Sequence, residues 1–138
     1  MTAPLALYVH WPFCRARCPY CDFNVHVRPT VDHARWRDAI CAAIDHYARE
    51  APDRPLGSIF FGGGTPSLMA PETVAVIVEH ARKVWPGADD VETTLEANPS
   101  DKPRFADFAD AGVTRLSLGI QALDDASLKT LGRDHDRA

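Results

Sequence analysis

The sequence lacks several features that define large classes of protein. It has no apolar stretch of the ~18 residues that a membrane helix needs, and its first residues lack the basic-then-apolar order of a secretory signal. It contains no run of lysine or arginine, and its 15 basic and 19 acidic side chains give a net charge of −4. These absences disfavour an integral membrane protein, a secreted protein and a nucleic-acid-binding protein, and the cytoplasm is the expected location.

Cysteine is also scarce, yet three of the four cysteines lie in one short segment. Cys14, Cys18 and Cys21 are separated by three and two residues and follow an apolar run. Cysteines at such short spacings hold iron–sulfur clusters. A cluster with only three protein ligands leaves one iron open to a substrate or cofactor. The segment therefore favours a catalytic cluster over a purely electron-transferring one.

The spacing leaves other interpretations open. A structural zinc site needs a fourth ligand, which His10 or His26 could supply, although no second cysteine pair is present. Cys41 lies in an expected helix, where a small core residue is the simpler interpretation. A disulfide framework is disfavoured by the odd number of cysteines in the loop, and unliganded thiols remain an alternative.

Hydrophobic periodicity predicts alternating strands and helices. An α/β chain of this kind forms a parallel sheet covered by helices. The last expected strand carries Leu116, Leu118 and Ile120 on one face and polar side chains on the other. In a barrel the polar face would point to the lumen and be satisfied there by other side chains or a ligand. A half-exposed strand of an open sheet is the alternative. About four units are present, too few to close a barrel, so we expect a truncated chain or an open half-barrel with an unpaired edge strand. The expected strands are 5–10, 58–61, 91–96 and 113–121, and the expected helices are 32–49, 71–85, 102–111 and one from 124.

A glycine run, Gly62 to Gly64, follows the second expected strand and precedes Thr65 and Pro66. Successive glycines bring backbone close to a ligand and expose N–H groups that grip a carboxylate or phosphate. A flexible turn is the alternative interpretation. A Walker nucleotide loop is excluded because the Lys-Ser/Thr pair is absent.

Four motifs in order resemble the radical S-adenosylmethionine (SAM) enzymes: the cysteines at 14–21, the glycine run at 62–66, Glu-x-Asn-Pro at 96–99 and Arg-Leu-Ser-Leu-Gly-Ile-Gln at 115–121. The resemblance is greatest to the branch of oxygen-independent coproporphyrinogen III oxidases and the haem chaperones of the HemW type. It implies a partial (β/α)6 barrel in which residues 1–138 are the N-terminal part of the core domain, with the cluster loop at about 11–30.

The resemblance also implies the cofactors. Cys14, Cys18 and Cys21 would hold a 4Fe–4S cluster, with SAM chelating the open iron and cleaved there by one electron. Eight further residues match positions that contact SAM in the family: Tyr8, Tyr20, Gly63, Gly64, Thr65, Glu96, Gln121 and Arg133.

Small differences divide the branch. Phe23 stands where the oxidases carry a further cysteine, and the segment 131–135 looks like the chaperone side. The resemblance therefore favours a haem chaperone, with haem or porphyrin as cargo, haemoproteins as acceptors and an electron donor as partner. The alternatives are an oxidase that decarboxylates two propionates to vinyls, and a zinc-stabilised scaffold.

Overall fold

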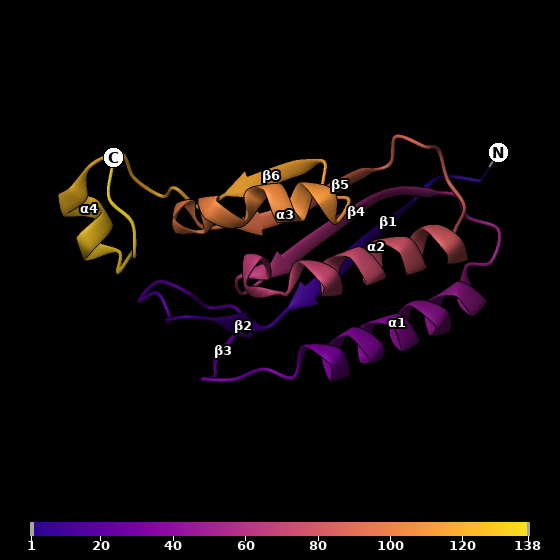
Figure 1. Cartoon of the computed structure of the whole chain (residues 1–138), viewed down its shortest axis with the longest axis horizontal. Coiled ribbons are helices and arrows are strands. Elements are labelled where there is room, and N and C mark those ends of the chain that lie inside the picture. The colour runs from indigo at the N-terminus through magenta and orange to yellow at the C-terminus, as the bar shows by residue number, and fades with distance from the viewer. Residues whose placement is uncertain (1, 138) are drawn as a thin grey trace.

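The computed structural model describes residues 2–137 and shows a parallel α/β sheet, as predicted (Figure 1). Its order is β1 (Leu5–Trp11), β4 (Leu56–Gly63), β5 (Glu92–Ala97) and β6 (Arg115–Leu118). The helices are α1 (His33–Glu50), α2 (Pro71–Val84), α3 (Phe105–Asp110) and α4 (Asp125–Thr130). Shorter elements flank the sheet: strands β2 (Phe13–Cys14) and β3 (His26–Val27), and 3₁₀ helices η1 (Pro66–Leu68) and η2 (Pro99–Arg104).

The register of the sheet separates a core face from an open face. Val9, Phe61, Leu95 and Leu116 are paired across the four strands, and the first three are buried. The neighbouring row is Tyr8, Phe60, Thr94 and Arg115. Tyr8 in this second row is 57% exposed, so the side of β1 that carries it is open. Thr94 in the same row is fully buried, so this face is open at β1 and covered at β5.

Helix α1 follows the expected pattern with one exception. The Asp32 carboxylate caps it by accepting a hydrogen bond from the Arg35 N–H at 3.0 Å. Ile44 is buried, and Cys41 packs against the hydrophobic core as predicted. The helical spacing that Tyr47 shares with Ile40 and Ile44 predicts a buried position for it, and this prediction is wrong. Tyr47 is 61% exposed, and its ring lies edge-on to His46 at the surface.

Two expected elements begin or end elsewhere. The strand expected at 113–121 ends at Leu118, because the Ile120 N–H turns back to the Leu118 carbonyl and Gln121 has a φ of +67°. Residues 99–104 form 3₁₀ turns before α3 rather than one helix from 102. Pro103, which lacks an N–H, lies inside these turns, and a capping box formed by Asn98 and Asp101 fixes their start.

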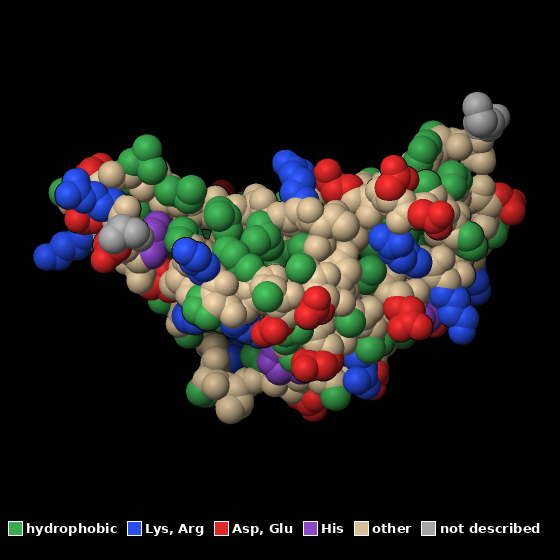
Figure 2. Space-filling model, turned by 45° about the horizontal axis from the view of Figure 1, so that its top comes forward, with side chains coloured by type: hydrophobic (Ala, Val, Ile, Leu, Met, Phe, Trp, Pro, Cys, Tyr) green, Lys and Arg blue, Asp and Glu red, His purple; other side chains and the backbone are tan. Residues whose placement is uncertain are grey.

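Strand β6 forms the edge of the sheet, as expected for the last strand. A shallow cavity of about 300 Å³ lies between α3 and this edge. Hydrophobic side chains lie among charged ones on this side of the molecule (Figure 2). Within residues 2–137, no helix is long and apolar enough to cross a bilayer.

Candidate functional site

An aromatic cluster anchors the start of the cysteine loop. Trp11, fully buried, and Phe13 lie edge-on to each other, with ring centroids 5.2 Å apart. Trp36 of α1 packs against both rings, and His33 stacks on Trp11. Because Cys14 directly follows Phe13, this packing fixes the position of the first cysteine relative to the sheet.

The glycine run after β4 holds the other side of the loop. The Gly64 N–H donates to the Trp11 carbonyl at 2.7 Å, and the Thr65 N–H donates to the Phe13 carbonyl at 2.8 Å. The Gly63 N–H donates to Glu96 Oε2 at 3.2 Å. The expectation that these N–H groups are available to a ligand was therefore wrong, because all three bind within the protein. Main-chain carbonyls and nearby side chains remain for a ligand.

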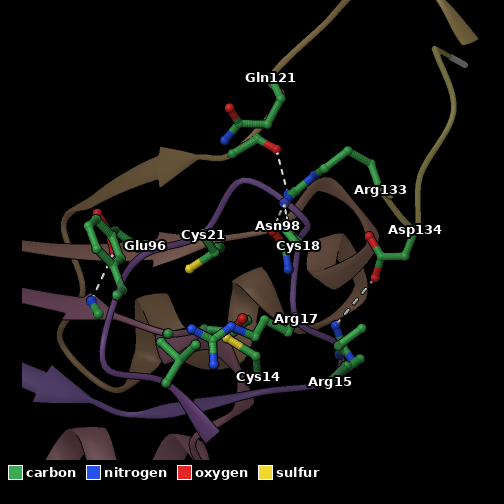
Figure 3. Close-up of a pocket in the computed structure, with 18 of the residues that line it drawn as sticks. Cys14, Arg15, Arg17, Cys18, Cys21, Glu96, Asn98, Gln121, Arg133 and Asp134 are labelled. Atoms are coloured by element: carbon green, nitrogen blue, oxygen red, sulfur yellow. Dashed lines mark hydrogen bonds and ion pairs between the residues drawn. The ribbon is translucent and has the colours of Figure 1, made fainter. Parts of the chain in front are cut away.

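All three loop cysteines line one cavity of about 410 Å³ at the carboxyl ends of β4, β5 and β6. Figure 3 shows Glu96 and Arg133 on opposite sides of the cysteine loop. Ten of the eleven residues predicted for the site line this cavity, and Tyr8 is the exception. The ten are Cys14, Cys18, Tyr20, Cys21, Gly63, Gly64, Thr65, Glu96, Gln121 and Arg133.

Tyr8 lies on the open face of β1. Its hydroxyl is 3.4 Å from His10 Nδ1, and its ring stacks on Phe60. Burial, together with the charge of Glu96, raises the pKa of Tyr8, and burial raises the pKa of Glu96 despite the hydrogen bond from Gly63. Tyr8 is therefore coupled electrostatically to a cavity residue without lining the cavity.

The thiols are not arranged around a single ion. Among the described residues, no three His, Cys, Asp or Glu side chains lie close enough to hold one metal ion. A zinc site draws its ligands to about 2.0–2.3 Å from one centre, whereas each thiolate of a cubane binds a different iron. His10 and His26, the candidate fourth zinc ligands, are outside the cavity. Neither histidine is therefore placed beside the three thiols as a fourth ligand.

Burial affects the first cysteine. It raises the pKa of the Cys14 thiol, and the neighbouring Cys21 and Cys18 add to the effect, while a hydrogen bond with Thr65 and the charge of Arg133 oppose it. Metal binding requires the thiolate. Arg133 and Thr65 therefore favour the form of Cys14 that binds metal.

Arg133, which follows α4, reaches across the cavity to the second cysteine. Its Nη1 lies 3.4 Å from Cys18 Sγ and 3.3 Å from the Tyr20 hydroxyl. Its Nη2 donates to Asn98 Oδ1 at 2.6 Å and to the Gly119 carbonyl at 2.9 Å. Its Nε is buried and has no partner in the described part of the chain. Such an orphaned donor beside a cavity fits an acceptor supplied by a ligand.

Asp101 lies in a buried network that sequence reasoning missed. Its carboxylate accepts hydrogen bonds from Arg15 Nη2 at 2.5 Å, Ser67 Oγ at 2.5 Å and the Asn98 N–H at 3.1 Å. Arg15 lies between the first two cysteines of the motif, and it also faces Asp134 at 3.9 Å. The network therefore ties the cysteine loop to η1 and η2. The sequence marks Asn98 within the motif at 96–99 and the segment 98–101 as a turn and helix cap, but no local pattern identifies Arg15.

The fold and the cavity define an α/β half-barrel with a thiol-lined centre at the carboxyl end of its sheet. Residues 8–138 match the model of the radical SAM superfamily. The chain is 48% identical to a mitochondrial radical S-adenosyl methionine domain-containing protein 1 of Mus musculus, over 94% of the chain and 30% of that protein. It is 41% identical to the heme chaperone HemW of Escherichia coli, over 96% of the chain and 36% of that protein.

The solved structure of coproporphyrinogen III oxidase (HemN) from Escherichia coli, described as a radical SAM enzyme, superposes with a TM-score of 0.83 at 27% identity. The match covers 96% of this chain and 31% of the oxidase. The chain belongs to the radical SAM superfamily. These relatives also confirm the branch that the motifs indicated. The chain spans about a third of the length of the curated relatives that it matches.

Proposed function

We propose that this chain is the cofactor-binding, N-terminal part of a radical SAM haem chaperone. In this proposal Cys14, Cys18 and Cys21 hold a 4Fe–4S cluster, and SAM binds beside it. The observation that carries the proposal is that the three thiols line one cavity together with Gly63 and Gly64. The fourth cysteine, Cys41, packs against the core on α1. With three cysteine ligands, a cubane keeps one iron free for another ligand.

The residues present fit both groups. The thiols supply the ligands that iron prefers. A Cβ at Gly64 would lie 2.6 Å from the Phe13 carbonyl oxygen and 3.0 Å from Cys14 Sγ, so a glycine is needed beside the cluster loop. When bound, the cluster and SAM supply one-electron chemistry. The chain orients them, with Glu96, Gln121 and the orphaned Nε of Arg133 available to polar groups of SAM.

The choice of a chaperone over an oxidase is supported by Phe23. Its ring is 59% exposed and lines the cavity, at the place where the oxidases carry a further cysteine. An apolar ring at the mouth of a cavity suits contact with a flat, apolar macrocycle such as haem. We expect the whole protein to pass haem to acceptor haemoproteins, to receive electrons from a donor, and to work in the cytoplasm, where thiols remain reduced.

The oxidase remains the second candidate because of the structural likeness to coproporphyrinogen III oxidase. In that reading the protein would convert two propionates to vinyls. The two functions differ in what happens to the tetrapyrrole, since a carrier returns it unchanged.

The proposal predicts haem binding without decarboxylation. The full-length protein is reconstituted anaerobically with iron and sulfide, analysed for both, and then titrated with haem. In parallel it receives SAM, a reductant and coproporphyrinogen III, and the porphyrin mass is followed. We expect about one haem bound per chain and no loss of carboxyl groups.

Three outcomes would contradict the prediction. Loss of two carboxyl groups would identify an oxidase. A colourless protein with one zinc per chain would identify the scaffold, and a protein with a cluster but no haem binding would remove the carrier role.

A further inference from the structure

Arg133 carries a positive charge beside the thiols of the cysteine loop. Within residues 2–137, none of its polar contacts is to an aspartate or glutamate. Two contacts are to neutral oxygens that hold its Nη2, the Asn98 side chain and the Gly119 carbonyl, and a third is to the Tyr20 hydroxyl. The remaining contact is Cys18 Sγ, the one partner that becomes anionic when it binds metal.

The other arginines around the cavity differ. Arg15 is neutralised by Asp101 at 2.5 Å and faces Asp134 as well. Arg17 lines the cavity but is exposed, and no described residue contacts its guanidinium by a hydrogen bond or ion pair. Water screens such an exposed charge. Arg133, half-buried and held by three oxygens, is therefore the guanidinium that acts most directly on the thiols.

We propose that Arg133 sets the reduction potential of the cluster by keeping its charge and an N–H donor on the sulfur of Cys18. The proposal rests on the proposed 4Fe–4S site and deepens it. One-electron reduction takes the cluster from its 2+ to its 1+ state, so the cluster and its thiolates together gain one negative charge. A nearby cation and a hydrogen bond to a ligating sulfur stabilise the more negative state, and the potential rises.

The contact has a functional consequence. A higher potential makes the cluster easier for an electron donor to reduce. Arg133 follows α4 in the chain, whereas Cys18 lies near the amino terminus, a separation of 115 residues. The charge of Arg133 therefore acts on the cluster only when the segment after α4 packs against the cysteine loop.

The test is an EPR-monitored redox titration of the reconstituted full-length protein without SAM, with dithionite as reductant. Arg133→Gln removes the charge, and we expect the equilibrium constant for one-electron reduction to fall about tenfold, which is ~59 mV in midpoint potential. Arg133→Lys keeps the charge but loses the guanidinium fork, so it should recover most of the shift. Arg17→Gln removes an exposed charge from the same cavity and should shift the potential much less.

A second variant keeps Arg133 in place. Asn98→Asp has nearly the same size and gives the guanidinium a carboxylate partner at the position that now accepts from Nη2 at 2.6 Å. Neutralising the charge should lower the equilibrium constant for one-electron reduction, as Arg133→Gln does. Because the new ion pair keeps the Arg133 side chain in place, a fall in this variant reports the net charge beside Cys18 and not a displaced guanidinium.

The outcomes separate this inference from the proposed function. A wild-type protein that assembles no cluster would overturn both. A wild-type cluster whose potential is unchanged in Arg133→Gln and Asn98→Asp, or changes no more than in Arg17→Gln, would overturn the inference alone. If Arg133→Gln loses its iron, the Asn98→Asp titration decides the matter.

Discussion

Gly63→Ala is expected to weaken SAM binding at least tenfold, whereas Gly112→Ala is expected to leave it unchanged. Gly63 ends β4 with a φ of +109°, and Gly112 precedes β6 with a φ of +98°. An alanine at either position strains the backbone by about 1–3 kcal/mol. The two variants are therefore matched in backbone φ but differ in place, since Gly63 lines the cavity and Gly112 does not.

The surroundings of Gly63 explain the larger effect. A Cβ there would lie 2.6 Å from the His10 ring and 2.9 Å from the Trp11 carbonyl oxygen. At Gly112 the nearest atom would be a side-chain methyl of Val78 at 3.3 Å. To relieve the clash, Gly63 must move, and its N–H would then pull away from Glu96. Each 1.4 kcal/mol changes an affinity tenfold, so a strain of this size in the site is enough to weaken SAM binding tenfold.

Anaerobic calorimetry of SAM binding to the reconstituted proteins measures the affinity, and urea unfolding measures the free energy of unfolding. Both variants should lose stability through the strained φ, and Gly63→Ala should lose more, because its Cβ also meets the Trp11 carbonyl and the His10 ring. Equal SAM affinities in Gly63→Ala and Gly112→Ala would show that the backbone at Gly63 does not shape the cofactor site.

The order of the elements could be predicted because each strand and helix carries its own hydrophobic period. The helical stripe and the apolar run 59–61 are local patterns. Ile44, Ile59 and Phe61 are buried as expected. Trp36, Ile40 and Phe60 are partly buried, and Tyr47 is exposed. Strands β2 and β3 were missed because two residues cannot show a period. Leu118 and Ile120 fit an alternating strand by pattern, but the turn at Gln121 ends the strand and leaves both exposed.

Residues that line the cavity could be predicted where their signal is local. The cysteine spacing and the glycine run are each visible within a few residues. The contacts that organise them are not, since Arg15 and Asp101 are 86 residues apart and have no shared pattern. The use of the Gly64 and Thr65 N–H groups inside the protein depends on where the cysteine loop packs, which is a tertiary property. Sequence therefore indicated which residues gather at the site, and the structure shows what holds them there.

Asp101→Asn is expected to destabilise the fold by about 3 kcal/mol at neutral pH, because it removes one partner of a buried, hydrogen-bonded charge pair. The Asp101 side chain is fully buried, whereas Arg15 is 46% exposed, so the cost falls at the lower end of the range for buried pairs. An amide would also turn an –NH₂ group toward donors that now bind the carboxylate, such as Ser67 Oγ. With Arg15 released, the cysteine loop loses its tie to η2, and the cluster should be lost faster in air.

The loss of stability caused by Asp101→Asn should depend on pH. Burial alone would raise the pKa of Asp101, but hydrogen bonds from Ser67, Arg15 and Asn98 outweigh burial and lower it. Below the unfolded value of about 3.9, the unfolded chain binds the proton more readily than the folded protein does. The stability from this carboxylate is thus present above that pH and is lost as the pH falls toward the folded value. In Asp101→Asn the free energy of unfolding should therefore change less with pH over this range.

Asp124→Asn is the matched control for Asp101→Asn. Asp124 also accepts a backbone N–H at the start of a helix, that of Ser127 at 2.9 Å, and its pKa is lowered mainly by hydrogen bonds from Ser127. It is exposed and has no arginine partner in the described chain, and asparagine caps helices as well as aspartate does. Urea unfolding of the metal-free proteins at several pH values compares the two. If Asp101→Asn cost no more than Asp124→Asn, the buried pair would not hold the cysteine loop, and the aromatic packing of Trp11 and Phe13 would have to carry that role.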